Sequence, residues 1–217
     1  MNNQLQWKYE KALAYEIFVK EEYWFAKDVI KKSNCIFDIW WHIWLFSKRC
    51  RELNKNVVIH YFEPIKQFYE KALEGFIEDK NIVLNNYWIS YKNEESEMFL
   101  NETKSMQTSK YHSFLNKDWK PVDVNFITLR EYLWESKINK IDLLKMDVEG
   151  MEFEILTSWW NLEISAIENL IIEVHLLNDD MKNQRETIND KLNNYFKSVV
   201  IINSDYTKNI FLVWARK

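Results

Sequence analysis

Short apolar runs alternate with segments of helical periodicity from position 35 onward. Runs rich in β-branched and aromatic residues lie at 35–39, 57–62 and 82–89. Between them, at 45–53 and 65–76, apolar residues recur every three or four positions. Strands that alternate with amphipathic helices are typical of βαβ units, whose strands lie parallel in one sheet. The pattern therefore predicts an α/β fold with a doubly wound sheet.

The segment 65–76 has the clearest helical period. Pro64 stands where a helix would begin, and there its missing N–H leaves no hydrogen bond unmade. The apolar positions of this helix are Ile65, Phe68, Tyr69, Ala72, Leu73 and Phe76.

The second half of the chain continues the alternation but ends differently. Strands are expected at 98–100 and 124–128, and the polar segment between them, 101–120, is expected to form a substrate-side loop. The last two strands follow one another without a helix, which predicts an antiparallel hairpin at one edge of an otherwise parallel sheet. The other expected elements are strands at 141–148, 170–176, 198–202 and 209–215 and helices at 151–158 and 179–196.

The beginning of the chain differs from the rest. Residues 8–32 carry apolar positions at mixed helical spacing and predict one or two amphipathic helices. The chain has 217 residues, which is a single-domain size, and no linker or repeat interrupts it. We expect an N-terminal helical extension over 1–32 and one α/β domain over 33–217.

Charge and composition narrow the class of partner. The chain has 29 basic and 33 acidic residues with no long run of either sign, so neither nucleic acid nor membrane is expected to bind. The first thirty residues lack the unbroken apolar stretch of a signal peptide or membrane helix, which predicts a cytoplasmic protein. Cys35 and Cys50 stand among apolar residues and are expected to be buried free thiols. The partner is expected to be a small or neutral molecule.

Polar side chains stand where the predicted strands end. In a doubly wound sheet, ligands bind at the carboxyl ends of the strands, near the point where strand order reverses. Glu63 follows the first turn by about 25 positions, which is typical of a carboxylate that binds ribose hydroxyls, although it would also suit a cap of the helix that follows. The residues at these strand ends are Asp38, Glu63, Asp147, Glu149, Glu173 and His175.

Two segments resemble the FkbM family of methyltransferases. Residues 141–152 read Ile-Asp-Leu-Leu-Lys-Met-Asp-Val-Glu-Gly-Met-Glu, which is similar to the family signature Asp-Leu-Leu-Lys-(Ile/Met)-Asp-Val-Glu-Gly-x-Glu. Residues 35–64 follow the family pattern of an Asp-x-Gly-x-x-x-Gly turn and a downstream Phe-Glu-Pro. The resemblance covers roughly residues 23–177. It implies a class I methyltransferase fold, Rossmann-like, with S-adenosylmethionine as cofactor.

The turn after the first strand departs from the family pattern. The family has glycine where this chain has Trp40 and Trp44, and usually a small residue where it has Trp41. Glycine permits positive φ and a close approach to the cofactor. An indole adds about 150–250 Å² of surface, and a left-handed residue costs roughly 1–2 kcal/mol. Three genuine indoles are expected to fill the place of the cofactor.

Two interpretations of these tryptophans compete. In the first they are genuine, and the protein is a non-catalytic pseudoenzyme or interaction module. In the second the gene uses a code that reads UGA as glycine, and the printed tryptophans are mistranslated glycines. The second explains both the 11 Trp and the 2 Gly, where an average usage of about 7% gives roughly 15 glycines. We favour it. The other candidate glycines are Trp24, Trp88, Trp134 and one of Trp159 and Trp160, whereas Trp214 fits a genuine strand residue.

The resemblance also implies roles for the candidate site residues. Asp38 would hold the turn or the ammonium group of the cofactor, Glu63 its ribose hydroxyls, and Asn86 its adenine. Asp147 is the first candidate for a general base or orienting group. Glu149 is the second, unless it only caps the following helix, and His175 is a rival base because its ordinary pKa is near 6.5. The full set of expected cofactor-binding residues is Asp38, Trp40, Trp41, His42, Trp44, Glu63 and Asn86.

The reaction implied is O-methylation of a hydroxyl on a sugar, glycan or small metabolite. Strand-end carboxylates and a histidine would suit a metal, but such carboxylates also recognise hydroxyls, and no metal is expected. An enzyme for nucleotide sugars or dinucleotides on a similar sheet is the alternative among enzymes. It is not favoured, because a dinucleotide site has no need of the Asp-Val-Glu-Gly segment. The sequence does not indicate the oligomeric state.

Overall fold

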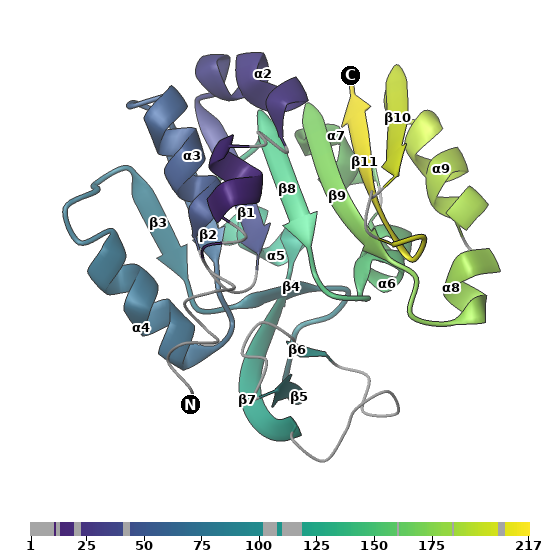
Figure 1. Cartoon of the computed structure of the whole chain (residues 1–217), viewed down its shortest axis with the longest axis horizontal. Helices are drawn as coiled ribbons and strands as arrows, with labels where there is room; N and C mark the ends of the chain where they lie inside the picture. The colour runs from purple at the N-terminus through teal and green to yellow at the C-terminus, as the bar shows by residue number, and fades with distance from the viewer. Residues whose placement is uncertain are drawn as a thin grey trace.

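A seven-stranded sheet forms the centre of the computed structural model (Figure 1). The structure describes residues 11, 14–19, 23–40, 44–101, 108–109, 119–159, 161–183, 185–203 and 207–217. The strands lie in the order β10-β11-β9-β8-β1-β2-β3. They are β1 (Cys35–Trp40), β2 (Val58–Phe62), β3 (Ile82–Asn85), β8 (Leu143–Asp147), β9 (Asn169–His175), β10 (Ser198–Asn203) and β11 (Ile210–Arg216).

The direction of the strands matches the predicted topology. The five strands from β9 to β3 are parallel, whereas β11 is antiparallel to both of its neighbours, β9 and β10. The chain builds the sheet outward from β1 through β2 to β3 and then returns to β8 on the other side of β1. Strand order therefore reverses between β1 and β8. The predicted doubly wound sheet with a C-terminal antiparallel edge hairpin is confirmed.

Helices connect the strands and cover both faces of the sheet (Figure 1). The predicted helix at 179–196 is divided into two, α8 and α9, and the sequence pattern had not indicated α5 or α7. Among the described residues the helices are η1 (Tyr15–Val19), η2 (Trp24–Ala26), α2 (Lys27–Lys32), α3 (Leu45–Leu53), α4 (Lys66–Gly75), α5 (Leu129–Ser136), α6 (Glu152–Ser158), α7 (Asn161–Ala166), α8 (Asp179–Asn183) and α9 (Arg185–Asn193).

The alternation of side chains along the central strands divides the core in two. In β8, Leu143 packs on the face that also contains Phe46 of α3, whereas Leu144 and Met146 pack on the opposite face with α5, α6 and α7. All five residues of β8 are buried, as expected for a central parallel strand covered on both faces. Ile17 and Ile30 from the N-terminal helices join the first face, so these helices share the core of the sheet.

A second, smaller sheet was not predicted. Its strands are β4 (Trp88–Ser90), β5 (Glu94–Asn101), β6 (Thr108–Ser109) and β7 (Trp119–Thr128), in the order β4-β7-β5-β6. The run at 82–89, predicted as one strand, is interrupted after Asn85, so that β3 and β4 belong to different sheets. Most of the predicted loop at 101–120 lies outside the described residues. In Figure 1 the small sheet lies beyond the carboxyl ends of the central parallel strands.

Two further sequence predictions concern single features. Cys50 is buried, Cys35 is half-buried against the core, and both thiols are free. Among the described helices, none is long and apolar enough to cross a membrane.

Candidate active site

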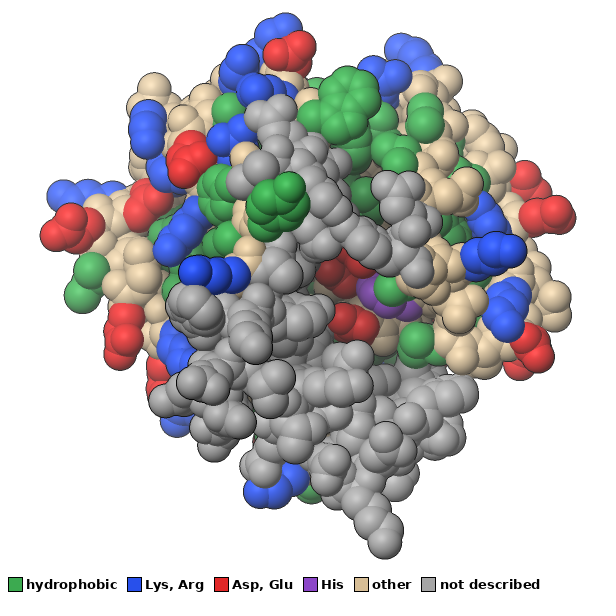
Figure 2. Space-filling view, viewed as in Figure 1, with side chains coloured by type: hydrophobic (Ala, Val, Ile, Leu, Met, Phe, Trp, Pro, Cys, Tyr) green, Lys and Arg blue, Asp and Glu red, His purple; other side chains and the backbone are tan. Residues whose placement is uncertain are grey.

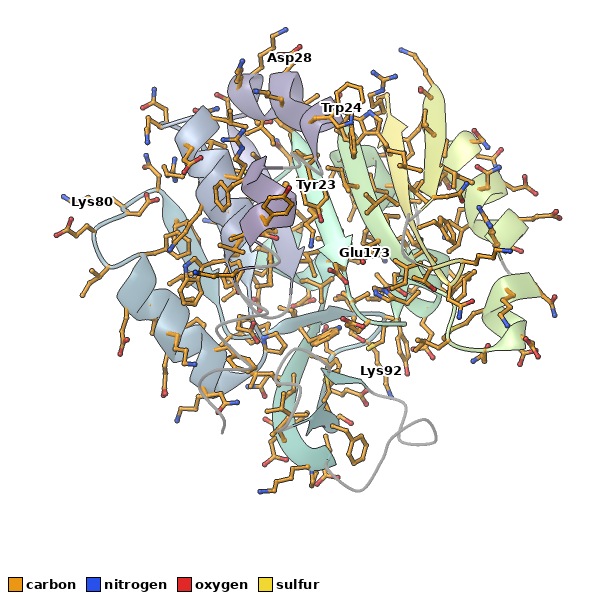
Figure 3. The ribbon with its side chains drawn as sticks, in the orientation of Figure 1. Tyr23, Trp24, Asp28, Lys80, Lys92 and Glu173 are labelled. Carbon is orange, nitrogen blue, oxygen red and sulfur yellow. The ribbon has the colours of Figure 1, made fainter. Side chains whose placement is uncertain are left out.

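The polar strand ends predicted from the sequence lie along one edge of the main sheet. Asp38 of β1 pairs in register with Lys145 of β8, and Asp147 at the end of β8 pairs with Glu173 of β9. These ends flank the point where strand order reverses, which is where open α/β sheets bind their ligands. In Figure 3, Glu173 lies at the lower end of β9, close to the small sheet.

Asp38 and Lys145 form a buried pair of charges beneath this edge. The hydroxyl of Ser47 in α3 donates to Oδ2 of Asp38 at 2.5 Å, which ties the end of β1 to the helix that follows. Burial raises the pKa of Asp38, and the positive charge of Lys145 counteracts only part of that effect. Lys145 has no exposed surface, and its Nζ lies 3.4 Å from Oδ2 of Asp147. No role was predicted from the sequence for this lysine, which lies close to the carboxylate of Asp147 and acts on the charge of Asp38.

Glu63 is fully buried at the end of β2. Its Oε1 accepts a hydrogen bond from the backbone N–H of Ile65 at 2.8 Å, in the turn before α4. Ile65 is the N-cap residue of α4, and no side chain of the described residues caps this helix. Asn86 binds the same segment, because its Nδ2 donates to the carbonyl oxygens of Glu63 at 2.8 Å and of Pro64 at 2.9 Å. Glu63 therefore does not cap the helix, and its expected contact with ribose stays a prediction.

His175 is the centre of a cluster of carboxylates. Its Nδ1 lies 2.9 Å from Oε1 of Glu152, and its Nε2 lies 3.6 Å from Oε2 of Glu149 and 3.8 Å from Oε1 of Glu173. Burial alone would lower the pKa of His175, but the charges of Glu149 and Glu152 outweigh that effect and hold the pKa well above 6.5. Figure 2 shows acidic and histidine surfaces side by side near the middle of this face.

Glu152 is a site residue that the sequence analysis missed. It is fully buried in the first turn of α6, and its Oε1 also accepts the backbone N–H of Gly150 at 3.1 Å. The chain turns sharply before it, with φ of 48° at Glu149 and 105° at Gly150. A left-handed residue other than glycine is uncommon and is often found at functional sites. The sequence did contain a signal for Glu152, because this residue ends the Asp-Val-Glu-Gly-Met-Glu segment of the family signature.

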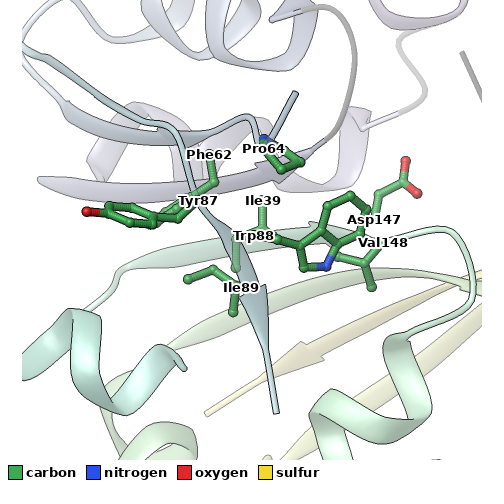
Figure 4. Close-up of a pocket in the computed structure, with 8 residues that line it drawn as sticks. All are labelled: Ile39, Phe62, Pro64, Tyr87, Trp88, Ile89, Asp147 and Val148. Carbon is green, nitrogen blue, oxygen red and sulfur yellow. The ribbon is translucent and has the colours of Figure 1, made fainter. Parts of the chain in front are cut away.

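A pocket of about 180 Å³ opens at the ends of β1, β2 and β8, beside β4 (Figure 4). Asp147 and Trp88 line it together, and Trp88 is only 2% exposed. The enclosed part of the pocket holds only about 10 Å³, whereas pockets for molecules of cofactor size usually enclose about 300–1,000 Å³. The Trp88 indole therefore occupies space that such a ligand would need. The other lining residues are Ile39, Phe62, Pro64, Tyr87, Ile89 and Val148.

The indole of Trp44 does not fill the expected place of the cofactor. Its φ is −54°, so its backbone has no left-handed strain. Its ring contacts Phe76 with centroids 6.0 Å apart, and a Cβ built on Gly75 would lie 3.0 Å from it, so the indole packs between α3 and α4. It does not line the pocket at the ends of β1, β2 and β8. Trp41, His42 and the Trp40 side chain lie outside the described part of the chain.

The other suspected tryptophans fall into two groups. Trp24 and Trp134 are largely exposed, whereas Trp88 and Trp159 are buried with indole N–H groups that have no hydrogen-bond partner among the described residues. Buried indole N–H groups usually find a partner. Trp214 is also buried, in β11. Burial does not separate a mistranslated glycine from a genuine tryptophan, so the glycine interpretation stays a prediction. Trp160 lies outside the described residues.

Comparison with known proteins identifies the family. A family model described as the methyltransferase FkbM domain matches residues 37–199, which is most of the chain. The chain belongs to this family. Its FkbM domain uses S-adenosylmethionine as cofactor, as the resemblance implied. A search of curated proteins finds no match to this FkbM chain.

Solved structures support the fold of this FkbM protein. A fibrillarin pre-rRNA processing protein from Methanococcus jannaschii matches with a TM-score of 0.51 and 12% identity, covering 86% of this chain and 67% of that one. An S-adenosylmethionine-dependent methyltransferase from Agrobacterium tumefaciens matches with a TM-score of 0.52 and 10% identity, covering 93% and 62%. The FkbM chain thus spans about three fifths of the Agrobacterium protein. These likenesses confirm the class I, Rossmann-like methyltransferase fold.

The polar groups of the site suit S-adenosylmethionine, but the pocket is too small for it. Oδ1 of Asp38 and Oδ1 of Asp147 are buried without hydrogen-bond partners within the described chain. Such acceptors suit the ammonium and hydroxyl groups of S-adenosylmethionine, which are hydrogen-bond donors. The pocket beside Asp147 would have to widen to hold the cofactor, and Trp88 is the largest side chain that lines it.

Proposed function

We propose that this FkbM protein transfers the methyl group of S-adenosylmethionine to a hydroxyl oxygen of a sugar, glycan or small metabolite. The observation that carries this proposal is the cluster of Asp147, Glu149 and His175 at the edge where strand order reverses. Carboxylates and an imidazole at this position suit an acceptor that must be oriented and must lose a proton. The cofactor supplies an electrophilic methyl group on a sulfonium.

The residues proposed for cofactor binding follow the strand ends. Asp38 and the turn after β1, including Trp40, Trp41, His42 and Trp44, would hold the amino-acid part. Glu63 would accept hydrogen bonds from the ribose hydroxyls after the β2–α4 segment adjusts, because its Oε1 already accepts the Ile65 N–H. Asn86 would contribute its amide oxygen near the adenine, because its Nδ2 is engaged by two carbonyl groups.

The acceptor hydroxyl must lose its proton to one of the side chains of the site. The acceptor oxygen bonds to the methyl carbon while the carbon–sulfur bond breaks and its electron pair remains on sulfur. The hydroxyl proton would move to Asp147, with Glu149 as the second candidate. His175 is less suited to accept it, because its raised pKa favours the form that already carries the proton. It would instead orient Glu149, 3.6 Å away.

A non-catalytic role is the second candidate, and one observation favours it. If the printed tryptophans are genuine, Trp88 narrows the pocket to about 180 Å³ and would oppose cofactor binding. The protein would then be a pseudoenzyme or an interaction module on a methyltransferase fold.

The test begins with protein made from the gene after its codons have been read. Isothermal titration measures binding of S-adenosylmethionine, and transfer of a radiolabelled methyl group to a panel of sugars and small hydroxyl compounds measures activity. We expect binding and transfer in the wild type, a loss of transfer of at least 100-fold in Asp147→Asn, and no change in Glu186→Gln, an exposed carboxylate on α9. If protein with confirmed glycines does not bind the cofactor, the methyltransferase proposal is wrong.

A further inference from the structure

The side chains at the ends of β8 and β9 have the composition of a cation site. Asp147, Glu149 and His175 each offer one ligand atom, and these atoms lie within 4.8 Å of one another. Glu173 borders the group, with its Oε1 3.8 Å from Nε2 of His175. We infer that Asp147, Glu149 and His175 bind a divalent cation of the Mn²⁺ type. From the sequence, these carboxylates were expected to recognise hydroxyl groups without a metal.

The orientation of His175 supports a ligand on its Nε2. Glu152 holds Nδ1 at 2.9 Å and is itself held by the Gly150 N–H at 3.1 Å. Nε2 therefore faces the carboxylates of Glu149 and Glu173. Histidines that bind metals generally donate their other ring N–H to a carboxylate, which fixes the tautomer and the direction of the ring. Glu152 is positioned to do this for His175.

A separate observation comes from Asp147. This residue is only 5% exposed, and its Oδ1 is buried without a hydrogen-bond partner among the residues described. Its other oxygen lies 3.4 Å from Nζ of Lys145. A buried carboxylate oxygen without a donor is costly, and a cation would satisfy it.

The donor set indicates the kind of ion. Carboxylate oxygens suit Mg²⁺ and Mn²⁺, an imidazole suits transition metals, and the group contains no thiolate. Ligands of one octahedral ion lie about 3.0 Å apart when adjacent and about 4.2 Å apart when opposite, if each bond is about 2.1 Å. The three ligand atoms lie within 4.8 Å of one another, so they must move closer together around an ion. The donor set, rather than the spacing, therefore indicates the ion.

This inference adds a cation to the proposed function. The role of the ion in methyl transfer rests on the proposed function. A bound cation with open positions would hold the acceptor oxygen beside the cofactor and make its proton easier to remove. Binding of the ion itself depends on the cluster alone. The competing explanation is a network of ion pairs in which an imidazolium takes the place of the metal.

Electron paramagnetic resonance of free Mn²⁺ tests the binding. The full chain, stripped with EDTA and dialysed, is titrated with MnCl₂ at pH 7.5. We expect about one tight site per chain, at least tenfold weaker binding in Glu149→Gln, 10- to 100-fold weaker binding in Glu152→Gln, and no change in Glu186→Gln. Glu149 is 28% exposed, so its substitution is expected to leave the fold intact, and circular dichroism checks this. Asp147→Asn provides a second ligand variant.

Two results would overturn the inference. One is a free Mn²⁺ signal that the wild type does not reduce, and the other is equal affinity in the wild type, Glu149→Gln and Asp147→Asn. Titration of S-adenosylmethionine in EDTA separates this inference from the proposed function. If the cofactor binds and transfer proceeds in EDTA while Mn²⁺ does not bind, the methyltransferase proposal stands and the metal site is wrong. If Mn²⁺ binds as expected while the cofactor does not, the metal site stands and the proposed function is wrong.

Discussion

Replacing Trp88 by glycine, in a chain that otherwise has the printed sequence, tests whether this indole blocks the cofactor. Trp88 is 2% exposed, and a tryptophan side chain buries about 150–250 Å², worth about 4–6 kcal/mol at roughly 25 cal/mol per Å². Its indole N–H is buried without a partner among the described residues, which offsets about 1–3 kcal/mol. We expect Trp88→Gly to lower the free energy of unfolding by roughly 2–5 kcal/mol without ligand.

The cofactor should reverse part of this loss. The substitution enlarges a pocket of about 180 Å³ at the expected binding edge, so we expect affinity for S-adenosylmethionine to rise at least tenfold, about 1.4 kcal/mol. At a ligand concentration of 100 times Kd, binding would add about 2.7 kcal/mol of stability. Isothermal titration gives the affinity, and thermal unfolding with and without cofactor gives the shift in Tm.

Trp159→Gly is the matched control. Trp159 is also buried, with an indole N–H that has no partner within the described chain, but it does not line the pocket. We expect a similar loss of stability and no gain in affinity. The reasoning fails if folded Trp88→Gly binds the cofactor no more tightly than the wild type, or if Trp159→Gly gains as much.

Three further predictions concern the gene, a buried histidine and the buried lysine. If the glycine interpretation is correct, DNA sequencing will show UGA at positions 40, 44 and 88 and UGG at 214. His60 is buried with Nδ1 2.7 Å from the Tyr132 hydroxyl, and burial lowers its pKa to about 4. Its stabilising contribution is therefore present above pH 6.5 and is lost as the pH falls towards 4. Urea unfolding measures the free energy of unfolding at pH 7 and at pH 4.5. The fall in this free energy between the two pH values should be about 2–3 kcal/mol smaller in His60→Gln than in the wild type. Lys145→Met should lower stability by about 3–5 kcal/mol because it removes the buried positive charge beside Asp38 and Asp147. Lys140→Met removes a lysine whose side chain is 58% exposed and should cost less than about 1 kcal/mol; equal losses would contradict this.

The main sheet could be predicted because its local patterns agree with its tertiary structure. Strands β1, β2 and β8 are short apolar runs, and α3 and α4 have helical periods of apolar residues, so each segment is identified by its own sequence. The division of residues 82–89 between two sheets gave only a weak signal, the Asn85-Asn86 pair, since asparagine is common in turns but no glycine or proline is printed in the run. The direction that the chain takes after Asn85 depends on pairing with β7, some forty residues away.

The candidate site could be predicted only in part, because some of its residues are brought together by tertiary contacts rather than by a local sequence pattern. Asp38, Glu63, Asp147 and His175 were found because they end apolar strands, and the structure brings them to one edge. Glu152 was missed because a glutamate in the first turn of a helix usually faces water and favours the helix dipole. Its place at the end of the Asp-Val-Glu-Gly-Met-Glu segment marked it as part of the family signature, but its burial against His175, 23 positions away, is a tertiary contact.

The charges of this edge connect the proposed cofactor with the inferred cation. Burying an ion costs several kcal/mol unless a partner compensates it, and apolar residues of similar size would often be as stable. Among the described residues of this edge, Lys145 and His175 accompany six carboxylates: those of Asp38, Glu63, Asp147, Glu149, Glu152 and Glu173. An excess of negative charge in a partly enclosed site concentrates positive ligands. The cofactor brings an ammonium and a sulfonium, and a divalent ion brings two more charges. A site built only to stabilise the sheet would not need this excess, so the charge imbalance favours ligands that are cations.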